Sequence, residues 1–222
     1  MFQFLPFRVC FVFWCKENIL QLRFATNLPV EQYIQRKAWR DVELDPCQLH
    51  PEGGCKIARH GTYSRKFPDG VKIARWYCPD GGTTFSKLPD CLSSRLPGTL
   101  IEVETVIDQI ESASSQEAAA DNIRMYISLP NVLRWMRRRL FPIRLTFALL
   151  IELLPSLPDN CKPTFSSFRS VLGIEFVLPH LRMLASPYLD ILPPPLGFGP
   201  RPKAHKSKKN RFQHKTGTDP PL

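Results

Sequence analysis

Three cysteines and a histidine are grouped between residues 47 and 78. Two residues separate Cys47 from His50, Cys55 follows directly after Gly53-Gly54, and Cys78 opens a second Gly/Pro-rich turn. Thiolates and an imidazole on tight turns can converge on one ion, and four such ligands bind zinc tetrahedrally. The spacing therefore predicts a structural zinc site made by Cys47, His50, Cys55 and Cys78.

The second turn lacks the ligand that would usually follow Cys78 by two to four residues. Those positions hold Asp80, Gly81 and Gly82. Two completions stay open: the four residues together, or three of them with Asp80 or a water molecule. His60 is a spare imidazole nearby. A degenerate site, in which the cysteines only pack, is the alternative, and a redox pair is not predicted because no Cys-x2-Cys is present.

The elements that position these ligands follow from the flanking sequence. Residues 57–66 and 71–78 have strand character, and Phe67-Pro-Asp-Gly70 between them is a four-residue turn in which Pro fixes one φ angle and Gly supplies a positive one. This pattern predicts a β-hairpin. Residues 16–40 are weakly typical of one amphipathic helix.

The second half of the chain is predicted to be helical. Apolar spacing indicates helices from about residue 99, over 116–124 and from Pro130 to Leu140, with Pro142 ending or bending the last one. A buried helix is expected over 143–154, followed by small helices. The predicted fold class is α+β: a zinc-ribbon-like hairpin, then a mostly α-helical region with a helix-turn-helix-like segment, then a disordered basic tail.

Changes in composition divide the chain into four parts. Residues 1–40 are a poorly defined extension, 41–96 the hairpin module, 97–192 the helical region with the helix-turn-helix-like segment at 99–140, and 193–222 the basic tail. The tail is rich in Pro, Gly and Lys and cannot bury enough apolar surface to offset its ordering entropy. The apolar run at residues 2–15 is too short to span a membrane.

Four short sequence motifs are similar to motifs in the N-terminal regions of bacterial insertion-sequence transposases and related uncharacterised proteins. They are Arg59-His-Gly-Thr-Tyr-Ser-Arg, Ile73-Ala-Arg-Trp-Tyr-Cys, Thr84-Phe-Ser-Lys-Leu-Pro-Asp and Arg134-Trp-Met-Arg-Arg. In those proteins a zinc ribbon precedes a helix-turn-helix. The resemblance covers about residues 47–140 and implies a DNA-binding, transposase-related protein; it departs at the second turn, where Gly81 and Gly82 stand in place of a ligand.

Arginines give the chain a predicted nucleic-acid surface. Arg134, Arg137 and Arg138 share one face of the predicted helix, and no acid lies between Asn131 and Arg144. Such a stripe can lie along phosphates or reach guanine edges, although a solvated basic face is the simpler alternative. The hairpin adds three arginines that are predicted to contact nucleic acid: Arg59, Arg65 and Arg75. The aromatic residues interleaved with them either stack on unpaired bases or form a small core.

The whole composition agrees with a polyanionic partner. The formal net charge is +10 and the isoelectric point about 9.5. Seven cysteines without the spacing of a disulfide framework favour a reducing, cytoplasmic compartment. No phosphate-binding glycine loop, nucleophile elbow or series of strand-borne carboxylates is present, so catalysis is not expected.

The sequence therefore predicts a non-catalytic protein that binds DNA, duplex in preference to single-stranded, and is transposase-related or regulatory. The alternative is a non-catalytic, zinc-stapled protein-interaction module, or a degenerate remnant of a mobile-element protein.

Overall fold

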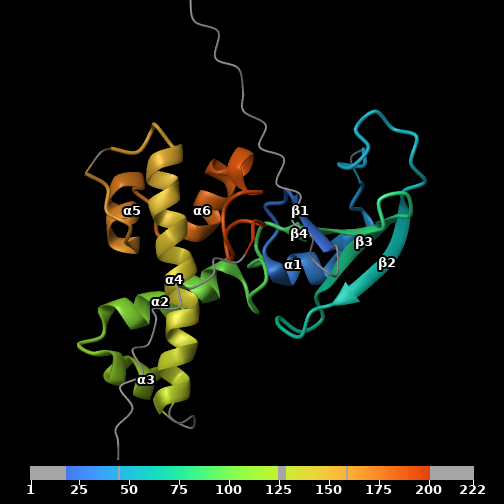
Figure 1. The fold of residues 1–222 in the computed structure, drawn as a ribbon. Helices are drawn as coiled ribbons and strands as arrows, with labels where there is room; N and C mark the ends of the chain where they lie inside the picture. The colour runs from blue at the N-terminus through green and yellow to red at the C-terminus, as the bar shows by residue number, and fades with distance from the viewer. Residues whose placement is uncertain (1–18, 45, 125–128, 159, 201–222) are drawn as a thin grey trace, which may run out of the picture.

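The computed structural model describes residues 19–44, 46–124, 129–158 and 160–200. Within these ranges the fold is α+β, as predicted, with a four-stranded sheet on one side and the longer helices on the other (Figure 1). The strand order is β1-β4-β3-β2, with β1 parallel to β4 and the other pairs antiparallel. The strands are β1 (Ile19–Phe24), β2 (Ala58–Ser64), β3 (Lys72–Cys78) and β4 (Thr83–Pro89).

The predicted hairpin is present as β2 and β3, and the turn between them closes at Gly70, whose φ is 76°. A third antiparallel strand, β4, follows directly after the second turn, where Gly82 donates a backbone hydrogen bond to Pro79 at 3.2 Å. The sequence did not indicate this strand, because it is buried along nearly all of its length and lacks an alternating pattern.

The prediction for residues 16–40 was wrong in the part that the structure describes. Ile19–Phe24 forms β1 rather than the start of a helix, and it pairs with β4 from Ile19↔Thr84 to Phe24↔Pro89. Helix formation is limited to α1 (Val30–Gln35) and a 3₁₀ turn, η1 (Ala38–Arg40), after Pro29. Residues 19–40 therefore belong to the sheet and its covering layer and are not a separate extension; residues 1–18 lie outside the described part.

The helices begin close to the predicted positions. Thr99 and Glu102 form a reciprocal capping box at the start of α2, and Thr164 caps α5. Pro142 neither ends nor separates the fourth helix, which runs through it as one continuous element. The helices are α2 (Leu100–Ser112), α3 (Gln116–Arg124), α4 (Leu129–Leu153), α5 (Phe165–Leu172), α6 (Val177–Leu184) and the 3₁₀ turn η2 (Ser186–Tyr188).

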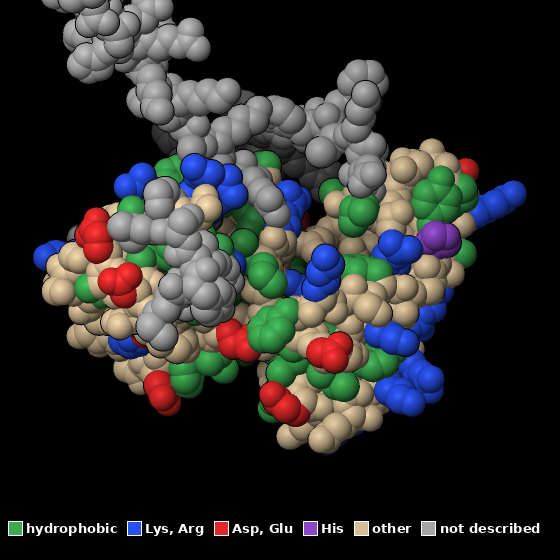
Figure 2. Space-filling view, turned by 90° about the horizontal axis from the view of Figure 1, so that it is seen from below, with side chains coloured by type: hydrophobic (Ala, Val, Ile, Leu, Met, Phe, Trp, Pro, Cys, Tyr) green, Lys and Arg blue, Asp and Glu red, His purple; other side chains and the backbone are tan. Residues whose placement is uncertain are grey.

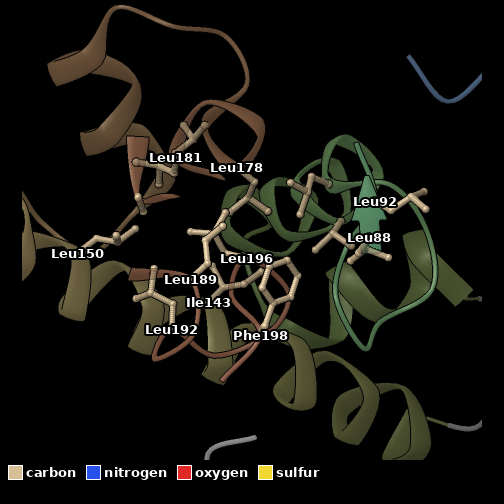
Figure 3. Close-up of a cluster of buried hydrophobic side chains, with 14 of the residues drawn as sticks. Leu88, Leu92, Ile143, Leu150, Leu178, Leu181, Leu189, Leu192, Leu196 and Phe198 are labelled. Carbon is tan, nitrogen blue, oxygen red and sulfur yellow. The ribbon is translucent and has the colours of Figure 1, made fainter. Parts of the chain in front are cut away.

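Buried apolar residues form a single cluster that joins the sheet to the helices. Figure 3 shows Leu88 of β4 and Leu92, which follows this strand, in one cluster with Leu178 of α6 and with Leu196 and Phe198. Residues 193–200 are thus packed in the core, which corrects the prediction that the disordered tail starts at residue 193. Residues 201–222 lie outside the described part.

The longest helix of the described chain, α4, has 25 residues, yet no described helix is apolar enough over a sufficient length to cross a bilayer.

Candidate metal centre

The four predicted ligands come from two places in the fold. Cys47, His50 and Cys55 lie in the segment that leads into β2, which has no helix or strand among its described residues, and Cys78 is the last residue of β3. The backbone N–H of His50 donates to Cys47 at 3.0 Å, so this first turn is tight. Pairing of β2 with β3 then brings Cys78 to the same end of the hairpin.

The ligand atoms of these four residues all lie within 4.8 Å of one another. Nδ1 of His50 lies 3.5 Å from Sγ of Cys47 and 3.5 Å from Sγ of Cys78. Cys47 and Cys78 are buried, while His50 and Cys55 are partly exposed at the rim. The arrangement is close enough to hold one metal ion with four protein ligands.

The predicted alternative fourth ligand, Asp80, has another partner. Its carboxylate accepts the backbone N–H of Lys56 at 3.1 Å and so ties the second turn to the chain that follows Cys55. His60 is on β2, where its ring packs near Tyr77 with 5.9 Å between centroids. Of the two predicted completions, the geometry therefore favours the cluster of three cysteines and His50.

The thiols of the cluster differ in acidity. Burial by itself raises the pKa of Cys47, but hydrogen bonds with His50 and the backbone of Leu49, and then with the other two thiols, lower the pKa to about 7. The pKa of Cys55 is instead raised, first by burial and then by the neighbouring Cys47 and Cys78. One thiol of the cluster therefore loses its proton readily near neutral pH, and its charge makes the next ionisation harder.

Two further residues support the cluster, and ligand spacing did not single them out. The backbone N–H of Gly81 donates to Sγ of Cys78 at 3.4 Å. A Cβ atom on Gly81 would lie 2.5 Å from Cδ1 of Leu49, so the glycine leaves room for this side chain against the cluster. The place of Gly81 in the second turn could have indicated this role, but from the sequence it indicated only that a ligand is missing there.

The three predicted hairpin arginines are held in different ways. Arg59 donates to the backbone oxygens of Trp39 and Arg40, at 2.5 and 2.8 Å. Arg65 donates to the backbone oxygens of Ser93 and Leu96, and burial lowers its pKa.

Arg75 has its guanidinium carbon 5.7 Å from the centroid of the Tyr63 ring. The structure thus gives Arg59 and Arg65 backbone partners inside the protein that the sequence did not indicate. Arg59 also lies beside an aromatic ring, with its guanidinium carbon 5.7 Å from the Trp76 ring centroid.

The predicted arginine stripe lies on the first half of α4. Arg134, Arg137 and Arg138 are all exposed, while Val132 and Met136 on the opposite side are buried. The neighbouring Arg139 is only partly exposed, with its guanidinium carbon 3.6 Å from the Trp135 ring centroid. Helix α3 contacts both α2 and α4, so the three helices form one packed unit.

Comparison with known proteins adds no relative: no protein-family model, curated protein or solved structure matches this chain.

Proposed function

We propose that Cys47, His50, Cys55 and Cys78 hold a structural zinc ion. Tetrahedral zinc, with Zn–S near 2.3 Å and Zn–N near 2.0 Å, places a sulfur and a nitrogen ligand about 3.5 Å apart. Nδ1 of His50 lies at this distance from the sulfur atoms of both Cys47 and Cys78, which supports the proposal. Three thiolates and an imidazole are also a preferred donor set for zinc.

The zinc ion would fasten the segment before β2 to the end of β3. Residues 46–57 carry three of the ligands and are without a helix or strand, so little backbone pairing holds them in place. Metal binding at such a site contributes directly to folding free energy. With four protein ligands, the ion has no open position for a substrate, so its role is structural.

We further propose that the protein binds duplex DNA through the first half of α4. The observation that carries this proposal is the exposed stripe of Arg134, Arg137 and Arg138 on a helix without an acid between Asn131 and Arg144. Residues three and four apart share a helix face, so the three guanidinium groups can meet one groove or one run of phosphates. The packing of α3 against α2 and α4 agrees with a helix-turn-helix arrangement.

A second candidate, a protein-interaction module, is favoured by a different observation. Large apolar side chains are exposed in the C-terminal helical part, at Val171, Phe176, Met183, Leu184 and Ile191. Five such side chains within residues 171–191 support a protein-binding surface on this part of the fold. On this alternative the zinc ion would still be structural, and the basic face of α4 would only be solvated.

One panel of full-length proteins tests both parts of the proposal. We expect one zinc per chain in the wild type and in the double variant Arg137→Glu/Arg138→Glu, and loss of zinc in Cys78→Ser, measured by elemental analysis. The double variant should lose binding to a labelled DNA duplex while it keeps its circular dichroism spectrum. Wild-type affinity should fall steeply as salt rises, because neutralised phosphates release counterions.

The matched control, Arg36→Glu/Lys162→Glu, changes the net charge by the same amount at two exposed cations outside α4. If this control loses as much duplex binding as the α4 variant, the contact is a general charge effect and α4 has no special role. Duplex binding that survives in the α4 variant would contradict the contact through α4, and a wild type that binds no duplex would leave the interaction module as the better explanation. Zinc retained by Cys78→Ser would contradict the metal site.

A further inference from the structure

Three residues in register across the sheet carry polar atoms without a partner. Gln21 of β1 pairs with Ser86 of β4, which pairs in turn with Arg75 of β3. Oε1 of Gln21, Oγ of Ser86 and Nε of Arg75 are each shielded from solvent and make no hydrogen bond within the described residues. Native proteins keep few such atoms, so this row marks a part of the sheet that lacks polar partners.

Exposed aromatic rings lie next to this row. Successive strand residues point to opposite faces, so Tyr77 shares the face of Arg75, while Trp76 between them points to the other face. Trp76 is 5% exposed and belongs to the core, whereas Tyr77 is 40% exposed. The ring of the exposed His60 lies 5.9 Å from that of Tyr77 across the strand pair. The aromatic residues of β2 and β3 therefore divide into Trp76 in the core, Tyr63 partly buried against it, and the exposed Tyr77 and His60.

The charge around this face suits a phosphate backbone. From Ala58 to Cys78 there are five Lys or Arg residues and one acid, Asp69. Figure 2 shows Lys and Arg side chains spread over the side of the molecule that carries the hairpin. Stacking rings beside cations are the usual means by which proteins hold unpaired nucleotides, because every base has a flat face.

We propose that this sheet face binds an unpaired nucleotide of single-stranded DNA or RNA. The base stacks on Tyr77 and His60, and the polar ends of the partly exposed Gln21 and Arg75 meet its edge, while Ser86 is 0% exposed and lies between them in the row. Both long side chains of the row are only partly buried, so a change of rotamer turns their polar ends toward the ligand. This site is separate from the duplex contact proposed for α4.

The test compares binding of labelled oligothymidylate and oligouridylate of about 15 nucleotides with binding of a mixed-sequence duplex. In the full-length protein, Tyr77→Ala should weaken binding of the single strands about tenfold or more, in line with the loss of one base–aromatic stack. Tyr77→Phe keeps the ring and should bind like the wild type. Comparison of the two oligomers shows whether DNA or RNA is preferred.

A matched control and the α4 variant make the result specific. Phe176→Ala removes an aromatic ring of similar exposure, 37%, from the C-terminal helical part and should leave single-strand binding unchanged. The variant Arg137→Glu/Arg138→Glu should lose duplex binding but keep the response of single-strand binding to Tyr77→Ala. Unchanged single-strand affinity in a folded Tyr77→Ala protein, or no binding of single strands by the wild type, would overturn this proposal and leave the duplex proposal standing.

Discussion

Gly81 is the residue at which the second turn departs from a conventional ribbon. A Cβ atom there would lie 3.5 Å from Sγ of Cys78 and 3.6 Å from Cε1 of His50, so the position faces the cluster. In the predicted ribbon pattern this position would be a ligand. Here His50, which lies in the first turn, places its ring beside Sγ of Cys78. Gly81 offers no side chain to the cluster, and its backbone N–H donates to the same sulfur.

Metal retention should depend on pH in a defined direction. The pKa of Cys47 in the fold is about 7, below its usual value of about 9, so its stabilising contribution is complete above pH 9 and lost as the pH falls through 7. Protons also compete with zinc for the other thiolates and for His50. We expect zinc release, followed with a chromogenic chelator, to increase as the pH falls from 8 to 5.

Cys91 provides the control, since burial raises the pKa of its thiol to about 11 and it is not part of the cluster. Cys91→Ser should have the same release curve as the wild type. Release that does not change with pH would contradict coordination by thiolates.

At the scale of elements, α2 holds the start of α6 through one buried carboxylate. Glu104 is fully buried and accepts the backbone N–H groups of Val177 and Leu178, at 2.9 and 2.8 Å. It also accepts from Arg169 of α5 at 2.7 Å, and Arg169 pairs in addition with Asp108. The N-cap residue of α6, Phe176, has no side-chain cap of its own, so the cap comes from a residue more than 70 positions earlier.

Glu104→Ala should therefore lower the free energy of unfolding by about 3–5 kcal/mol, because it leaves two buried N–H groups and part of a buried ion pair unmet. Glu111→Ala is a matched control on the same helix, since its pair with the exposed Arg144 is 3.4 Å long. Glu111→Ala should lower the free energy of unfolding by less than about 1 kcal/mol. Urea denaturation measures both; equal effects would contradict the capping role of Glu104.

At the scale of the molecule, residues 193–200 contact both the segment that follows β4 and helix α6. The backbone oxygen of Pro195 accepts from Ser94 and from the buried Arg182, each at 2.9 Å. The guanidinium carbon of Arg182 lies 5.1 Å from the ring centroid of Phe198. The segment after β4 thus meets α6 and residues 195–198, about 100 positions later in the chain, in one part of the core.

Phe198→Ala should accordingly destabilise the whole protein by about 3–5 kcal/mol, as expected for a large side chain removed from a packed core. Ile191→Ala, at a position that is 60% exposed, should change stability by less than about 0.5 kcal/mol. Thermal or urea unfolding distinguishes the two. A Phe198→Ala protein as stable as the control would show that this segment does not contribute to the core.

Local patterns predicted the hairpin, the start of α2 near residue 99 and the group of four candidate metal ligands. Each depends on residues close together in the chain: a Pro-Asp-Gly turn, the helical spacing of apolar residues after Thr99, and cysteines at turns. The sequence did not predict β1, whose apolar residues suit either a helix or a strand until β4 provides a parallel partner. It also misplaced the start of the tail, because composition does not record that Leu196 and Phe198 meet a core built by other segments.

The sequence by itself determined which residues can bind a metal, since thiol and imidazole chemistry and turn spacing are local properties. Tertiary structure alone decided that Asp80 binds a backbone N–H rather than joining the cluster, and that Arg59 and Arg65 face backbone carbonyls. It also decided that Tyr77 is exposed while Trp76 is buried. The physical reason is that a side chain's partner depends on which distant segments pack beside it, and strand pairing and core packing fix this only in the folded chain.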